Sequence, residues 1–144
     1  MSFMAVAAML IGAAQAHGTE WFDVLSYGGE TLAINPDIIT TDNGVSYQVW
    51  VRNSFDTPES RADYSQERNY AAPVAYKLTL YKFTNNWKRF NIVEVSVYGE
   101  DGNVIDQYAN ADLAATESDI PYGSPIETIA ENAKIMYDIK TNPE

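Results

Sequence analysis

The chain has 144 residues, a formal net charge of −11 and no cysteine. A surface this acidic repels nucleic acid and anionic lipid headgroups, so we expect neither as a partner. Without cysteine the chain has no disulfide, no thiol nucleophile and no residue on which a bacterial lipid anchor could be built, so we expect a protein without a lipid anchor. The length suits one domain with a hydrophobic core.

The first sixteen residues, MSFMAVAAMLIGAAQA, carry no charge and are apolar from Phe3 to Ala14. They end in a small-x-small pattern that signal peptidase accepts. This run is shorter than the roughly 20 apolar residues of a transmembrane helix, and no later stretch is long and apolar enough for one. Signal peptides usually open with Lys or Arg and this one does not, so a buried N-terminal helix is the alternative. The pattern predicts cleavage after Ala16 and export of one domain, residues 17–144, to the periplasm, the cell surface or the medium.

After the signal, apolar and polar residues alternate with a period of two, which is typical of strands. Six strands are predicted, at residues 21–25, 31–34, 45–52, 75–83, 90–98 and 104–108. The third is expected to bury only the face that carries Val45, Tyr47, Val49 and Val51, and the fifth to carry Val93, Val95 and Val97 on one face. Asp42-Asn43-Gly44 and Asp101-Gly102-Asn103 are hairpin sequences, because Asn-Gly and Asp-Gly tolerate a positive φ.

The strongest helix signal lies near the C-terminus, where Ser124-Pro125-Ile126-Glu127 has the parts of a capping box. Apolar residues then recur every three or four positions, which predicts a helix from Pro125 to about Lys140. An isolated helix of about 14 residues is marginal in water, so it must dock on the sheet. The predicted fold class is α+β: an antiparallel sheet of about six strands with one C-terminal helix packed on one face.

Residues 53–73, NSFDTPESRADYSQERNYAAP, are polar and show no sustained period. We interpret them as a long surface loop, and loops of this length are usually functional or disordered. Tyr64, Tyr70 and Phe55 are the candidate contact residues within this loop, and a mobile surface loop without a binding role is the alternative.

The chain has few residues that could act in catalysis, because it has no cysteine and its one histidine, His17, would begin the mature protein. A Ser-His-acid triad and a usual zinc site are therefore excluded within the domain. An N-terminal histidine can chelate copper, but such sites need a second histidine. The acidic residues show no spacing that singles out a catalytic pair. We therefore predict no enzyme activity, no cofactor and no metal.

A local cluster of basic and aromatic residues stands out in this acidic chain. It lies at one strand-turn-strand corner and consists of Lys77, Tyr81, Lys82, Trp87, Lys88 and Arg89. Aromatic and arginine side chains are favoured at binding hot spots, so this corner is a candidate contact for an acidic or glycan partner. The alternative is that the lysines protect a strand edge while Trp87 folds onto the core.

Several segments appear in the order found in one family: Trp21, the Ile-Asn-Pro-Asp-Ile run of 34–38, Val49-Trp50, the hairpin of 97–105 and the Ile-Pro…Gly-Ser segment of 120–124. This collinear set resembles the surface-adhesin protein E family of bacterial envelope proteins. The resemblance implies an antiparallel sheet with a C-terminal helix held against it, and adhesin-like binding of host matrix proteins. Family members typically clamp that helix with a cysteine pair, so here the apolar stripe alone would hold it.

Together these observations predict an exported, non-catalytic, adhesin-like binding protein. Its partner would be a protein or a glycan at the bacterial envelope or the host surface. The alternative is a structural or stress-related subunit of a periplasmic envelope assembly.

Overall fold

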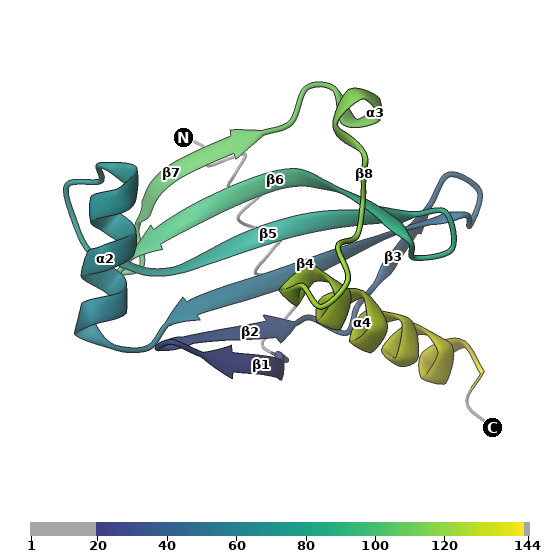
Figure 1. Cartoon of the computed structure of the whole chain (residues 1–144), viewed down its shortest axis with the longest axis horizontal. Helices are drawn as coiled ribbons and strands as arrows, with labels where there is room; N and C mark the ends of the chain where they lie inside the picture. Colours follow the sequence, from purple (N-terminus) through teal and green to yellow (C-terminus); the bar gives the residue numbers. More distant parts are fainter. Residues whose placement is uncertain (1–19, 143–144) are drawn as a thin grey trace.

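The computed structural model describes residues 20–142, which form an antiparallel sheet and three helices (Figure 1). The strands are β1 (Phe22–Tyr27), β2 (Glu30–Ile34), β3 (Ile39–Thr41), β4 (Ser46–Phe55), β5 (Val74–Thr84), β6 (Arg89–Gly99), β7 (Val104–Ala109) and β8 (Ser118–Asp119). The helices are α2 (Pro58–Arg68), α3 (Leu113–Thr116) and α4 (Pro125–Thr141). The predicted α+β class is confirmed, whereas the predicted signal peptide and His17 lie outside the described residues.

Six of the strands follow one another across the sheet in the order β1-β2-β4-β5-β6-β7, and every pair is antiparallel. They correspond to the six predicted strands. The two short strands were not predicted: β3 pairs with β4 and β8 pairs with β6. They span three and two residues, which is too short to show a period of two.

The two hairpins expected from turn sequences are present. Asp42, Asn43 and Gly44 have φ values of 55°, 58° and 85°, and they join β3 to β4. Gly102, at φ 84°, lies in the turn between β6 and β7. A left-handed backbone favours Asn, Asp and Gly, which explains why these dipeptides predicted the turns.

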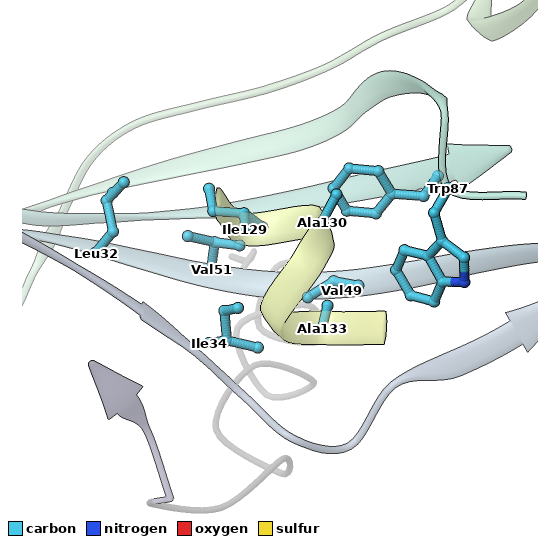
Figure 2. Packing of buried hydrophobic residues seen from close by; sticks show 9 residues of the cluster. Leu32, Ile34, Val49, Val51, Trp87, Ile129, Ala130 and Ala133 are labelled. Atoms are coloured by element: carbon cyan, nitrogen blue, oxygen red, sulfur yellow. The ribbon is translucent and has the colours of Figure 1, made fainter. Parts of the chain in front are cut away.

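Helix α4 begins and packs as its sequence predicts. The Ser124 side chain accepts a hydrogen bond from the Glu127 backbone N–H at 3.2 Å, and Pro125 opens the helix. Its inner side is almost fully buried, at Ile129, Ala130 and Ala133. Figure 2 shows these three side chains among Leu32, Ile34, Val49 and Val51 of the sheet and Trp87 of the β5–β6 turn. We call this side of the sheet the α4 face.

The other side of the sheet also buries apolar residues. Because side chains alternate along a strand, Trp50 and Arg52 point away from α4. Trp50 packs there with Leu78, Leu80 and Tyr98, and Trp21, Tyr76 and Val93 lie against them. We call this side the Trp50 face. The prediction that the third strand buries one face only is therefore wrong.

The prediction that three valines of β6 share a face is wrong as well. Leu80 pairs with Glu94 and Tyr81 with Ile92, so a bulge skips Val93. A bulge turns the side chains on either side of it to different faces. Val95 and Val97 accordingly pack with Phe55, while Val93 lies on the Trp50 face.

The long loop predicted over residues 53–73 is wrong, because this stretch contains the last residues of β4 and the whole of helix α2. The buried residues of α2 are Ser60 and Ser65, so the helix has no apolar stripe for a periodicity search to find. Its ends carry the signal instead. Thr57 and Ser60 cap the start reciprocally, and Asn69 ends the helix in the left-handed conformation at φ 59°.

Candidate functional site

Two of the four basic residues of the predicted corner, Lys82 and Arg89, are paired with carboxylates of the chain itself. Lys82 Nζ lies 2.8 Å from Asp42 Oδ2, and hydrogen bonding to that lysine lowers the pKa of Asp42. Arg89 Nε lies 2.7 Å from Glu117 Oε2, and the same guanidinium contacts Asp119. These ion pairs tie the β3–β4 turn to β5 and β8 to β6. Little of their charge is left for a partner.

The aromatic residues of the corner belong to the core. Trp87 is 8% exposed and stacks on Tyr47 with 4.4 Å between ring centroids. Burial raises the pKa of Tyr81 to about 12. Among the four basic residues of the corner, Lys88 alone is both exposed and without an ion pair within residues 20–142. It lines a shallow cleft of about 320 Å³ between the β5–β6 turn and α4.

Three candidate residues from the two predicted regions meet beside α2. Tyr64, on α2, stacks on Phe55 with 4.6 Å between centroids, and Lys77 Nζ lies 5.1 Å from the Tyr64 ring centroid. The Tyr70 ring is 6.4 Å from Tyr64, and its hydroxyl donates to Asp106 Oδ2 at 2.7 Å. The structure thus joins Lys77 to the tyrosines of the supposed loop and separates it from the corner.

We call Tyr64, Tyr70 and Lys77 the Tyr64 cluster. The tyrosine hydroxyls of this cluster form hydrogen bonds with other side chains of the protein. Arg68 lies over the Tyr64 ring, donates to the Tyr64 hydroxyl at 3.3 Å and reaches the Tyr108 hydroxyl at 3.5 Å. Burial, followed by the hydrogen bond to Asp106, raises the pKa of Tyr70. Polar atoms that are paired in this way attach α2 to the sheet, which is a structural role.

A cleft on the other side of the sheet combines aromatic rings with two guanidinium groups. Its volume is about 480 Å³, and it is lined by Trp21, Arg52, Ser54, Phe55, Asp56, Arg61, Ala75, Tyr76, Leu78 and Tyr98. We call it the Arg52 cleft. Its charged lining residues are two of the nine basic residues of the chain, Arg52 and Arg61, and one carboxylate, Asp56.

Strand register builds the cleft. Ser54 of β4 pairs with Tyr76 of β5, and Tyr76 pairs with Tyr98 of β6, so the three side chains stand in one row across the sheet. The two tyrosine rings stack with centroids 4.7 Å apart and planes 12° apart. Arg52 and Leu78 form the next row. The cleft floor is thus a rigid strand surface, which suits a preorganised binding site.

Among the arginines of residues 20–142, Arg52 is the one whose Nε is buried without a hydrogen-bond partner. Its guanidinium carbon lies 5.0 Å from the Trp21 ring centroid, a cation–π contact. Arg52 also makes no ion pair with any residue between 20 and 142. Because Nε is shielded, an anion in the cleft would contact Arg52 through its terminal nitrogens, which form charge-assisted hydrogen bonds.

Arg61 supports one wall of the cleft from α2. Its Nε donates to the Phe55 carbonyl at 2.8 Å and its Nη1 lies 3.1 Å from Glu100 Oε2. Asp56, the one carboxylate among the lining residues, accepts a hydrogen bond from Thr31 Oγ1 at 2.6 Å. Arg61 is thus paired with Glu100 and Asp56 accepts from a neutral hydroxyl, whereas Arg52 has no carboxylate partner within residues 20–142.

The tyrosines of the cleft are neutral at physiological pH. Burial raises the pKa of Tyr98 to about 12. Burial also raises the pKa of Tyr76, against the opposing effect of the nearby Arg52 charge. Neutral phenols donate and accept hydrogen bonds, so these two hydroxyl groups join that of Ser54 in the lining of the cleft.

Of the residues that line the cleft, the sequence singled out only Phe55 as a contact residue, and it placed Phe55 in the supposed loop. One further signal was present: Trp50 occupies, with Arg52, the alternate and supposedly solvated face of the third predicted strand, where a tryptophan is unusual. Tyr76, Tyr98 and Trp21 come from three other segments. Their convergence depends on strand register, which periodicity does not supply.

The chain matches no family model, no curated protein and no solved structure. The resemblance to the surface-adhesin protein E family therefore stays a prediction. Within residues 20–142, no helix is long and apolar enough to cross a membrane. In the same part of the chain, no three His, Cys, Asp or Glu side chains are placed to hold one metal ion.

Proposed function

We propose that this chain is an exported, non-catalytic, adhesin-like protein that binds a protein or glycan partner at the bacterial envelope or the host surface, and that the Arg52 cleft is its contact site. The observation that carries the proposal is the Arg52 guanidinium, which has no ion pair within residues 20–142 and lies in one cleft with Trp21, Tyr76 and Tyr98. Concave sites with aromatic walls and a few convergent polar groups are the usual form of a ligand site.

The surroundings of the cleft favour binding over chemical conversion. The lining residues include no histidine, and the carboxylate of Asp56 already accepts a hydrogen bond from Thr31. General acid–base catalysis needs a group that can exchange a proton near the operating pH. The two tyrosines have raised pKa values, which keeps them protonated well above neutrality.

The predicted corner is the natural control surface for this proposal. Its charges at Lys82 and Arg89 are paired with carboxylates of the chain, and Trp87 is buried. Removing charge there changes the total charge more than Arg52→Gln does, yet leaves the cleft intact.

The test is capture from envelope and host-matrix extracts by the immobilised protein. We expect Arg52→Gln to lose the captured partner, because the charged donor of the cleft is gone. The triple variant Lys82→Gln, Lys88→Gln, Arg89→Gln should keep it. Loss in the triple variant with retention in Arg52→Gln would place binding at the corner and contradict the proposal. Melting curves of both variants exclude unfolding as the cause.

A further inference from the structure

The Arg52 cleft has a chemical composition that narrows its ligand. We propose that it binds the terminal sugar of a glycan, and that this sugar carries a single carboxylate. The inference rests on the proposed function, because it names the ligand class of the same site.

We infer a carboxylate on the ligand from the position of Arg52. Its guanidinium is held over the Trp21 indole, and its Nε is buried without a hydrogen-bond partner. A planar guanidinium presents parallel donors that match the two oxygens of a carboxylate. Such a pair in a partly buried cleft is stronger than the same pair in water.

We infer a sugar ring from the aromatic side chains that line the cleft. Tyr76 stacks on the buried Tyr98, and the partly exposed Trp21 ring lies against Arg52 in the same cleft. Aromatic side chains present an apolar face together with a polar edge. A pyranose has an apolar C–H face for such a ring and hydroxyl groups for the Tyr76, Tyr98 and Ser54 hydroxyls. The cleft volume of about 480 Å³ suits one or two sugar units rather than a long chain.

A peptide is a poorer match for this position. Extended peptides usually bind by adding a strand to an open sheet edge. The floor of the cleft is made by β4, β5 and β6, and each of these strands is paired on both sides. Their backbone groups are used within the sheet, so the cleft offers side chains only.

The net charge of the chain restricts the ligand further. At −11, the protein repels a polyanion over distances of about one Debye length. One carboxylate can approach the local charge of Arg52 without bringing many others to the acidic surface. We therefore expect an isolated acidic sugar at a glycan end, rather than a sulfated or polyuronic chain.

Titration calorimetry with matched pairs of short glycans tests the inference. Sialyllactose against lactose examines a sialic acid end, and a glucuronic acid–glucose disaccharide against cellobiose examines a uronic acid end. We expect at least one acidic glycan to bind about tenfold or more tightly than its neutral match, since a charge-assisted hydrogen bond is worth about 1.5–3 kcal/mol. The pair that shows the difference identifies which of the two acids the cleft takes.

Two variants connect the result to Arg52. Arg52→Gln should remove the preference for the acidic glycan, and Arg52→Lys should keep part of it, because a lysine retains the charge but loses the parallel donors. Arg61→Gln, which loses a residue already paired with Glu100, should have a smaller effect.

Equal binding of acidic and neutral glycans, or an acid preference that survives Arg52→Gln, overturns the inference. Failure of both acidic glycans to bind overturns it as well. If extracts still yield a partner that depends on Arg52, the proposed function stands and only the ligand class is wrong. If that capture also fails, both are wrong.

Discussion

Helices α4 and α2 cover the same face of the sheet, but they are held there by different contacts. Ile129, Ala130 and Ala133 of α4 are buried in an apolar cluster shared with three strands (Figure 2). The buried residues of α2 are Ser60 and Ser65, and its one large contact is the stack of Tyr64 on Phe55. Figure 1 shows the two helices over different ends of the strands.

The difference separates stability from binding. Apolar burial at about 25 cal/mol per Å² stabilises the whole domain, so α4 cannot detach without loss of the core. Paired hydroxyls and caps stabilise a helix by smaller, local amounts. The weaker helix is the one that brings Arg61 to the Arg52 cleft. We infer that α4 maintains the fold and that α2 shapes the site.

The largest expected effect is on α4. Ile129→Asp places a carboxylate at a position that is 1% exposed, and we expect a loss of about 3–5 kcal/mol or failure to fold. Ile139→Asp, on the same helix but 65% exposed, is the matched control and should change stability little. Urea unfolding of the two variants decides the matter. Equal midpoints would show that α4 does not dock through Ile129.

A smaller effect is expected where α2 meets the β1–β2 turn. A Cβ at Gly29, at φ +78°, would lie 3.1 Å from Thr57 Oγ1 and 3.3 Å from Ser60 Cβ, the two capping residues of α2. Gly29→Ala should cost about 1–2 kcal/mol and speed hydrogen exchange in α2.

The neighbouring glycine provides the comparison for that variant. Gly28, at φ +59°, has open space around a built Cβ, so Gly28→Ala adds backbone strain without touching the cap. Exchange in α2 should stay at the parent rate. Equal acceleration in both variants would mean that the turn, rather than the Gly29–cap contact, controls the helix.

Tyr70→Phe should cost about 1 kcal/mol at neutral pH, because Asp106 loses its hydrogen-bond donor. The folded state raises the pKa of Tyr70 above its usual value near 10, so the stabilisation is fully present below pH 10 and is lost as pH rises above it. The stability gap between parent and variant should therefore shrink in alkaline solution. Unfolding curves at neutral pH and above pH 10 measure it, and a gap that widens would contradict the Tyr70–Asp106 contact.

The smallest effect is expected at the corner predicted from the sequence. Lys82→Gln breaks the pair with Asp42 at an exposed turn, and such pairs contribute little to stability. We expect an unchanged melting temperature at neutral pH. A clear drop would show that the β3–β4 turn depends on this pair.

The sequence predicted those parts of the fold that have a local cause. The cap at Ser124 with the apolar stripe predicted α4, and the Asn-Gly and Asp-Gly dipeptides predicted the hairpins. Helix α2 was missed because its inward residues are serines, although the cap at Thr57 and the proline after it were visible.

The candidate site could be predicted far less well, because its cause is not local. Lys82 and Arg89 were chosen as free cations, yet their partners Asp42 and Glu117 are distant in sequence and only the folded chain brings them together. The Arg52 cleft depends on the register of three strands and on Trp21 reaching across from the start of β1. Local patterns carry no information about such pairings.

The central claim is that binding runs through the Arg52 cleft, and the three tryptophans of the chain provide a direct test. Trp21 lines the cleft, whereas Trp87 is buried under α4 next to the predicted corner. Indole N–H signals can be followed by ¹H–¹⁵N NMR while the partner, or an acidic glycan, is added. We expect the Trp21 signal to shift with the ligand and the Trp87 signal to stay in place. A shift at Trp87 with Trp21 unchanged would contradict the account and move the site to the corner around Lys88.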